Sequence, residues 1–522
     1  MGRARNVLFI MCDQFRADHL GSAGHPTLAT PNLDGLAARG VRFDRAFVQS
    51  GVCGPSRMSF YTGRYMASHG ATWNRVPLNV GEWTMADYLK PAGLQAVLAG
   101  KTHVLPDTAG LERFGIEAGS ALGVLLREGG FRLLDRYDGH SPPGSESGYA
   151  AYLRAHGYDS KDPWSDFVIS AVAPSGEVVS GWHMRHARLA ARVREEHSET
   201  AYMTDQAIRF IEGEGERPWF LHLSYVKPHW PYMAPAPYHA FYGPNQMLPA
   251  NRNAAELEDQ HPVLAAYRRH EESQNFARDE VVATVRPTYM GLIAQIDAHI
   301  GRLVARLDAL GRLEDTLIIF TADHGDLLGD HWLGEKEIFY EPVVRVPFIL
   351  VDPDPAADAT RGGVETRLVE AIDVLPTCLD ALGLPIPVER LEGRSLLPLT
   401  RGAADVGSWR DAVFSELDYA FREARRILGR NPSECRAWMV RTEAWKYVFW
   451  QGYRPQLFDL VNDPAELRDL GADPAYAARR AELHERLFLW LRGRAMRTTA
   501  SDVYVEARTA THKAHGIHFG VW

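Results

Sequence analysis

Two short, mostly apolar segments, NVLFIM at 6–11 and TLIIFT at 316–321, place the strongest constraint on the fold. Apolar runs without polar alternation are typical of strands buried on both faces, as the strands of parallel sheets are. Similar runs predict further strands at 95–99, 219–224 and 346–351, and helical spacing predicts helices at 30–40 and 287–310. Alternation of this kind predicts an α/β fold with a large, mostly parallel central sheet flanked by helices.

The sequence pattern changes toward the C-terminus. WMVRTEAWKYVFW at 438–450 alternates about a central turn, which is typical of an antiparallel hairpin. A helix capped by Asp463 and Pro464 is expected to follow, and the spacing at 476–496 predicts another. We therefore expect a smaller α+β subdomain that contains an antiparallel sheet.

These patterns predict two domains, a catalytic α/β domain over 1–400 and the C-terminal subdomain over 401–522. Two aperiodic stretches, about 106–195 and 243–283, are expected to be insertions that form lids over the site. The weakly patterned, aromatic tail after Thr498 is interpreted as an arm that grips a neighbouring subunit. A homo-oligomer, either a dimer or a tetramer, is expected.

Charge and composition exclude several classes of protein. The net charge of −9 disfavours nucleic-acid binding, which depends on neutralising phosphates. The four cysteines are scattered and form no disulfide framework. No apolar run approaches membrane-spanning length, and the N-terminal run ends at Asp13 without a cleavage site. We expect a soluble, cytoplasmic protein with no membrane partner.

Two of the predicted strands end in the same way, one in Asp13–Gln14 and the other, after Ala322, in Asp323–His324. The carboxyl ends of parallel strands lie at one edge of a sheet, where ligands bind. Oxygen ligands with one imidazole suit Mg²⁺, Ca²⁺ or Mn²⁺. The sequence therefore predicts one divalent metal ion at this edge, and Asp326 is expected to cap a helix rather than bind the ion.

Several motifs together resemble the type I sulfatases and the related phosphonate monoester hydrolases of the alkaline phosphatase superfamily. The most specific is CGPSR at 53–57, followed by TGR at 62–64. The two strand-end pairs described above match as well. The remaining matches are Lys101–Thr102–His103, Lys336 and the C-terminal Phe458–Asp459–Leu460.

The resemblance implies that a formylglycine-generating enzyme oxidises Cys53 to formylglycine (3-oxoalanine). One hydroxyl of the hydrated aldehyde binds the metal, loses its proton and attacks the sulfur or phosphorus of a small anionic ester, displacing the alcohol. The second hydroxyl then loses its proton, and the covalent ester collapses with release of the oxyanion. Cys53 is therefore both the nucleophile and a fifth predicted metal-site residue, beside the two strand-end pairs.

The resemblance also assigns roles around the substrate. Arg57 is expected to pair with the formylglycine hydrate, and His103 to act as the base for the collapse. His229 or Lys336 is expected to protonate the leaving oxygen. The anionic head of the ester is expected to contact Lys101, His103, His229 and Lys336, with Asn74 touching one of its oxygens.

The chain departs from typical sulfatases, which carry Asp–Asp and Asp–Asn at the two strand ends. Its Asp13–Gln14 and Asp323–His324 resemble the phosphonate monoester hydrolases, whereas the Lys101-x-His103 pair resembles true sulfatases. We predict a promiscuous sulfate monoester hydrolase, because a cationic pair stabilises a departing sulfate. A phosphonate monoester or phosphodiester hydrolase is the alternative. A phosphomutase would carry Ser or Thr at Cys53, and a non-enzymatic binding protein would have lost one of these motif residues.

Overall fold

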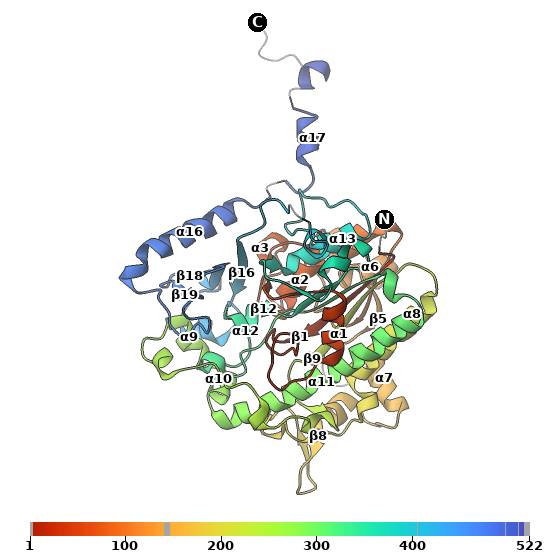
Figure 1. The fold of residues 1–522 in the computed structure, drawn as a ribbon, viewed down its shortest axis with the longest axis vertical. Helices are drawn as coiled ribbons and strands as arrows, with labels where there is room; N and C mark the ends of the chain where they lie inside the picture. The colour runs from red at the N-terminus through yellow and green to blue at the C-terminus, as the bar shows by residue number, and fades with distance from the viewer. Residues whose placement is uncertain (1–3, 140–146, 404–405, 496, 510, 516–522) are drawn as a thin grey trace.

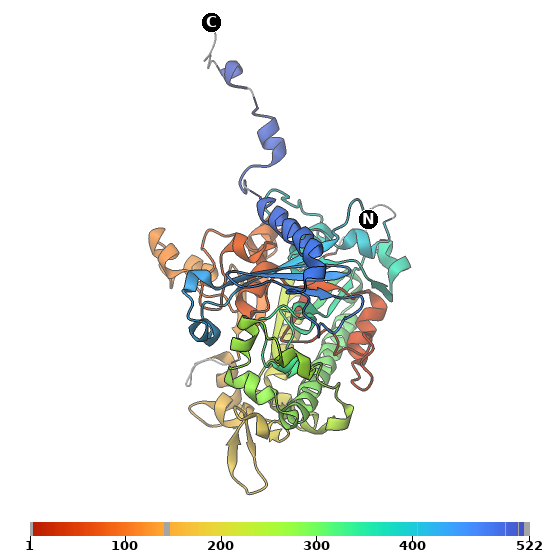
Figure 2. The same ribbon diagram turned by 90° about the vertical axis from the view of Figure 1, so that its left-hand side faces the viewer.

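The structure is a computed structural model that describes residues 4–139, 147–403, 406–495, 497–509 and 511–515. Figures 1 and 2 show a layered body from which the helix α17 (Asp502–Glu506) projects. Across the described ranges, no helix has the length and apolar character needed to cross a membrane.

An eight-stranded sheet forms the centre of the molecule. Its inner strands β11, β1, β9 and β4, with β5 at the edge, are all parallel, whereas β13 runs antiparallel to both of its neighbours. The predicted large, mostly parallel sheet is therefore confirmed. In spatial order the strands are β14 (Gly363–Glu365), β2 (Val41–Phe43), β13 (Phe348–Val351), β11 (Thr316–Ala322), β1 (Asn6–Asp13), β9 (Phe220–Pro228), β4 (Ala96–Gly100) and β5 (Arg132–Arg136).

Helices cover the two faces of this sheet (Figure 1). The helices α1 (Pro31–Arg39), α8 (Glu199–Glu214) and α11 (Asp279–Ala309) pack together on one face. The helices α2 (Cys53–Thr62), α4 (Met85–Leu89) and α13 (Val374–Ala381) pack on the other. Strands β1 and β11 are buried along their whole length between these helices, which explains why their sequences lack polar alternation.

Helix α11 is longer than the sequence pattern predicted. Its expected start, Pro287, lies inside the helix, which begins at Asp279. Buried Val281, Val282 and Val285 extend the apolar stripe of the helix toward its N-terminus. The predicted start of this helix at Pro287 was therefore too late in the sequence.

A four-stranded antiparallel sheet forms the C-terminal part, in the order β16 (Ala412–Asp418), β17 (Arg436–Thr442), β18 (Trp445–Trp450) and β19 (Gln456–Asp459). The predicted hairpin is confirmed as β17 and β18. Helix α16 (Ala477–Arg492) packs on β17 and β18, and Figure 2 shows it lying along one face of the sheet.

The predicted helix at Asp463 and Pro464 was wrong, because this segment forms turns. Glu466 has a φ of 56° and turns its carboxylate inward, where Oε1 lies 2.6 Å from Lys446 Nζ. The buried ion pair fixes a backbone conformation that a right-handed helix excludes.

The two aperiodic stretches contain more regular structure than expected. The first supplies the edge strand β5 to the main sheet and the helices α5 (Thr108–Arg113), α6 (Ala121–Arg127) and α7 (Gly148–Ala155). It also supplies three strands of a small second sheet, β6 (Ser170–Val172), β7 (Val178–Ser180) and β8 (Ala190–Ala191), which β10 (Ala234–Pro235) completes. The second stretch contains α9 (Pro262–Tyr267) and α10 (Glu271–Phe276). The domain boundary near residue 400 stays a prediction.

Candidate active site

Four neighbouring strands of the main sheet each deliver one predicted site residue at their carboxyl end. Asp13 is the last residue of β1, and Asp323 directly follows β11. His229 follows β9, and Lys101 follows β4. Because these strands are adjacent and parallel, the four side chains meet at one edge of the sheet.

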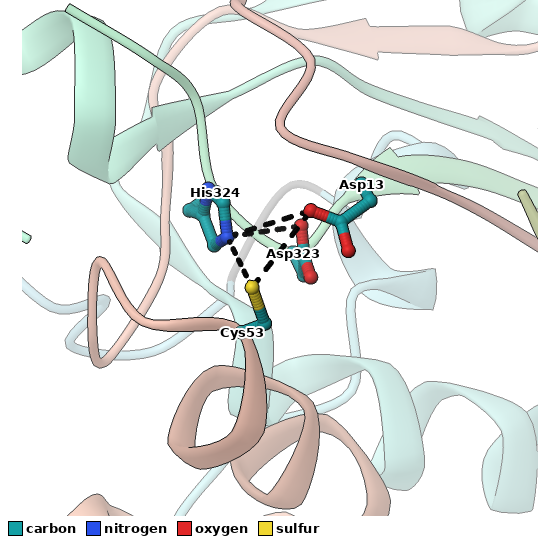
Figure 3. Close-up of side chains that lie close together, drawn as sticks. All are labelled: Asp13, Cys53, Asp323 and His324. Carbon is teal, nitrogen blue, oxygen red and sulfur yellow. Dashed lines mark hydrogen bonds and ion pairs between the residues drawn. The ribbon is translucent and has the colours of Figure 1, made fainter. Parts of the chain in front are cut away.

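Cys53 reaches this edge as the first residue of α2 (Figure 3). Its Sγ lies 3.1 Å from His324 Nε2 and 3.8 Å from Asp13 Oδ1. Ligand atoms of Asp13, Cys53, Asp323 and His324 all lie within 4.8 Å of one another, and all four residues are buried. Two carboxylates and an imidazole are a donor set that divalent cations accept, so the group fits a metal ion.

His324 is oriented with one ring nitrogen toward the group. Its Nδ1 lies 2.9 Å from the carbonyl oxygen of Gly325, and since a carbonyl only accepts, Nδ1 donates and Nε2 faces Cys53. Burial opposes a charge on the ring, but Asp323 and Cys53 raise the pKa of His324 to about 9. The negative charge around the ring comes from Asp323 and Cys53, and a bound cation would neutralise it.

Arg57 ties the helix to the two carboxylates. Its Nε donates to Asp323 Oδ2 at 2.8 Å and its Nη2 to Asp13 Oδ2 at 3.3 Å. Nη1 donates to the Lys101 carbonyl at 2.9 Å and to Ser224 Oγ at 2.7 Å. In this structure Arg57 therefore holds both carboxylates, and its pairing with a formylglycine hydrate stays a prediction.

Lys101 forms a buried ion pair with the first carboxylate, since its Nζ lies 2.5 Å from Asp13 Oδ2. Burial opposes both charges, but each partner stabilises the other. Lys101, His229 and Arg57 together hold the pKa of Asp13 well below its usual range despite burial. Asp13 likewise overcomes burial and raises the pKa of Lys101, so both groups are charged near neutral pH.

Gln14 and Lys336 belong to one hydrogen-bonded chain. Lys336 Nζ donates to Gln14 Oε1 at 2.8 Å, and Gln14 Nε2 donates to Asp326 Oδ2. Tyr232 donates its hydroxyl to the same Asp326 oxygen at 2.6 Å. The expectation that Asp326 caps a helix was wrong: the segment is irregular, and the buried carboxylate instead orients the Gln14 amide.

His103 lies on a strained turn that Asp138 holds in place. The backbone N–H groups of Thr102 and His103 both donate to Asp138 Oδ1, at 3.2 and 3.3 Å. The His103 backbone has a φ of 55°, which is rare for a residue other than glycine. Burial and the neighbouring Lys101 hold the pKa of His103 well below its usual range.

His229 and Asn74 complete the predicted residues. His229 Nδ1 lies 2.7 Å from the carbonyl oxygen of Trp230, and its Nε2 lies 4.0 Å from Asp13 Oδ1. Asn74 Oδ1 accepts the Gly54 N–H at 2.7 Å. The Asn74 side chain thus forms a hydrogen bond with the first turn of α2. Contact between Asn74 and a substrate stays a prediction.

Sequence reasoning missed three residues that support this site, namely Ser224, Tyr232 and Asp138, and it also missed the inward role of Asp326. Ser224 had a readable signal, because it is a polar residue near the carboxyl end of a predicted strand. Asp138 had none, since it lies in an aperiodic stretch and acts through backbone groups of another segment.

Comparison with known proteins agrees with this geometry. A family model described as Sulfatase matches residues 5–384, and one described as N-sulphoglucosamine sulphohydrolase, C-terminal, matches 329–491. The chain is 34% identical to the multifunctional alkaline phosphatase superfamily protein PehA of Trinickia caryophylli, over 95% of this chain and 96% of that protein. It is 28% identical to an arylsulfatase of Clostridium perfringens, covering 94% and 95% of the two chains.

Solved structures of other proteins share the fold of this chain. The phosphonate monoester hydrolase of Silicibacter pomeroyi superposes with a TM-score of 0.83 at 30% identity, covering 94% of this chain and 96% of that one. Both the resemblance read from the motifs and the predicted fold class are thereby confirmed. This chain belongs to the sulfatase family, within the alkaline phosphatase superfamily.

Proposed function

We propose that this protein hydrolyses sulfate monoesters with a formylglycine nucleophile made from Cys53. The observation that carries the proposal is the buried group in which the Cys53 Sγ lies 3.1 Å from His324 Nε2, beside Asp13 and Asp323. Cys53 is also the first residue of α2, at the positive end of the helix dipole, which stabilises a negatively charged group.

The metal ion belongs to the same proposal. We assign Asp13, Asp323 and His324 as its protein ligands, with Gln14 and the modified Cys53 as further candidates. When bound, such an ion acts as a Lewis acid and lowers the pKa of a coordinated hydroxyl. The choice among Ca²⁺, Mn²⁺ and Mg²⁺ stays open at this oxygen-rich group.

The cationic side chains are assigned to the anionic ester. Lys336 keeps its proton near neutral pH, because Cys53, Glu335 and Asp13 outweigh burial and raise its pKa. Lys101 and Lys336 thus supply fixed positive charge where negative charge develops. His103, whose lowered pKa leaves the ring neutral, is the group that we assign to accept a proton. His229 and Lys336 are the candidates to protonate the leaving oxygen.

The second candidate is a phosphonate monoester or phosphodiester hydrolase. It is favoured by the likeness to the Silicibacter pomeroyi hydrolase and by Gln14 and His324 at the strand ends. The Lys101–His103 pair favours sulfate esters. Because all three ester classes carry one negative charge at the reacting group, we propose a promiscuous enzyme with sulfate esters as its preferred class.

A side-by-side measurement of kcat/KM tests the proposal, with an aryl sulfate, phenyl phosphonate monoesters and a phosphodiester as substrates. The highest value is expected for the aryl sulfate, and a higher value for the phosphonate would favour the second candidate. The formylglycine-generating enzyme as a partner, a cytoplasmic location and a homo-oligomeric state stay predictions.

A further inference from the structure

A pocket of about 280 Å³ opens beside the predicted reaction centre. Four segments that are far apart in the sequence supply its walls. They are the loop after β7, the turn after β9, helix α10 and the segment just before Lys336. The lining residues are Gly181, Trp182, Met184, Trp230, Pro231, Tyr232, Glu271, Glu272, Asn275, Phe276 and Glu335.

The pocket adjoins the catalytic side chains at three points. Trp230 follows His229, and the two rings are 4.2 Å apart between centroids. Glu335 precedes Lys336, whose Nζ lies 5.9 Å from the Trp230 ring centroid. Tyr232, on the inner wall, donates to Asp326 in the chain of hydrogen bonds that holds Gln14. A group bound in this pocket therefore lies next to the residues assigned to the ester and to the leaving oxygen.

The walls of the pocket are aromatic. Trp182 and Trp230 are in contact, with their ring centroids 5.7 Å apart, and Tyr232 meets Phe276 edge to face at 6.3 Å. Trp182 is 50% exposed, so an indole of this size at the rim leaves a large apolar surface uncovered. Aromatic faces attract cations through their quadrupole, and indole does so best.

The pocket carries carboxylates, whereas the side chains assigned to the anionic ester, Lys101 and Lys336, are cations. Three of the described residues that line it are glutamates, and none of them is a lysine, arginine or histidine. Glu272 is neutralised by Arg422, which bonds its carboxylate. Glu335 lies 3.7 Å from Lys336 Nζ, a cation already assigned to the ester, and Glu271 is exposed at the start of α10. Positive groups at one end and carboxylates with aromatic rings at the other fit a substrate with two opposite charges.

We propose that this pocket binds the alcohol part of the substrate, and that the preferred alcohol carries an ammonium group. The substrate is then a zwitterionic ester, with its sulfate at Lys101 and Lys336 and its ammonium between Trp182, Trp230 and the carboxylates of Glu271 and Glu335. The inference rests on the proposed function for the reaction, but the cation site itself is independent of turnover.

An isosteric substrate pair tests the charge directly. The sulfate ester of choline is compared with its neutral carbon isostere, in which a tert-butyl group replaces the trimethylammonium group. Both esters have the same shape, so kcat/KM differs only through the charge. We expect the ammonium ester to be favoured by about tenfold or more. Equal values, or a preference for the neutral ester, would overturn the proposal.

Variants of the pocket residues test whether the preference for the ammonium ester arises in this pocket. Glu271→Gln with Glu335→Gln, and separately Trp182→Leu, are expected to bring the ratio for the two esters close to one. Using the ratio cancels any indirect effect of the Glu335 change on Lys336. Glu258→Gln, an exposed acid outside the pocket, is the matched control and should leave the ratio unchanged. A ratio that survives both pocket variants would place the cation site elsewhere.

A binding measurement separates this proposal from the proposed reaction. Choline and its neutral isosteric alcohol are titrated into the Cys53→Ala protein, with tryptophan fluorescence as the readout. Saturable quenching by choline only, lost in Trp182→Leu, supports the cation site even if no sulfate ester is hydrolysed. If no ester is hydrolysed but choline still binds, the result counts against the proposed function and not against the cation site. Absence of binding would overturn the pocket assignment.

Discussion

Arg57 Nε donates to Asp323 Oδ2 at 2.8 Å across a separation of 266 residues, and neither side chain is exposed to solvent. This ion pair joins the helix that begins with Cys53 to the end of strand β11. Removing one partner of a buried pair leaves the other charge uncompensated, which costs about 3–5 kcal/mol. The start of helix α2 and the end of strand β11 therefore hold each other in position.

Replacement of Asp323 by Asn is expected to remove metal and activity together. The amide keeps the shape of the carboxylate but not the negative charge that holds an oxygen-ligated divalent ion. We expect kcat/KM to fall by about a hundredfold or more, with metal content measured by mass spectrometry on the purified protein. Asp315→Asn, just before the opposite end of the same strand, is the control. Full metal content in Asp323→Asn would show that the ion is held elsewhere.

Cys53 is expected to be absent as a thiol from the active enzyme. Mass spectrometry of the tryptic peptide ending at Arg57 should show sulfur lost and an aldehyde oxygen gained. Cys53→Ser should fold, react once and stall as a stable ester, since serine has no second hydroxyl to expel the group. Cys53→Ala should lack even the first step. Repeated turnover by Cys53→Ser at the wild-type rate would contradict the mechanism but not the fold.

Exchange of Lys101 for Tyr and His103 for Thr is expected to shift specificity toward phosphonate monoesters. The change removes the buried cation 2.5 Å from Asp13 Oδ2, so kcat/KM for sulfate esters should fall by about a hundredfold. The ratio of aryl sulfate to phenyl phosphonate activity is the measurement. If that ratio does not change, specificity is set outside this pair, with the 106–195 stretch the next region to test.

His222 is expected to make the protein less stable in acid. Its Nδ1 lies 3.0 Å from the Phe9 carbonyl oxygen and its Nε2 lies 3.1 Å from the Tyr61 hydroxyl, so both ring nitrogens have partners inside the core. Burial lowers the pKa of His222 to about 3. Below pH 6.5 the unfolded chain takes up a proton that the folded chain does not, so stability is lost as the pH falls. The loss amounts to about 2 kcal/mol at pH 5.

Urea unfolding at pH 7.5 and at pH 5 measures this contribution. His222→Gln should be less stable at both values, but its loss between them should be about 2 kcal/mol smaller than in the wild type. The exposed His183→Gln is the control. An equal loss in wild type and His222→Gln would show that other groups carry the acid dependence.

Removal of residues 497–522 is expected to disrupt the predicted homo-oligomer. Figures 1 and 2 show α17 (Asp502–Glu506) standing away from the body, and its Val503 is 80% exposed. The neighbouring Tyr504 is 49% exposed as well, and adjacent exposed apolar side chains on a projecting arm are a candidate contact with another chain. Sedimentation velocity at micromolar protein should show a dimer or tetramer that the truncation converts to monomer. A wild-type protein that is already monomeric would refute the assembly.

The sequence by itself determined the central architecture and which residues are candidates for the reaction. Strands such as 6–11 and 316–321 were readable because a strand buried on both faces has no polar alternation. Asp13 and Asp323 were readable because each follows such a strand, and parallel strands end at one edge. Cys53 was readable as a candidate because it lies in a short motif, shared with Arg57, that resembles the motif of the sulfatases.

Only the tertiary structure decided the partners of these residues. Asp326 binds Gln14 rather than a helix end, and Glu466 turns toward Lys446 in place of the expected helix. Both contacts join residues that are not neighbours in the sequence. Leaving a buried charge unpaired costs more free energy than the local preference for a helix provides. The aromatic and acidic pocket likewise exists only because four distant segments fold against one another. Local patterns do not encode such contacts, so no reading of the chain alone reaches them.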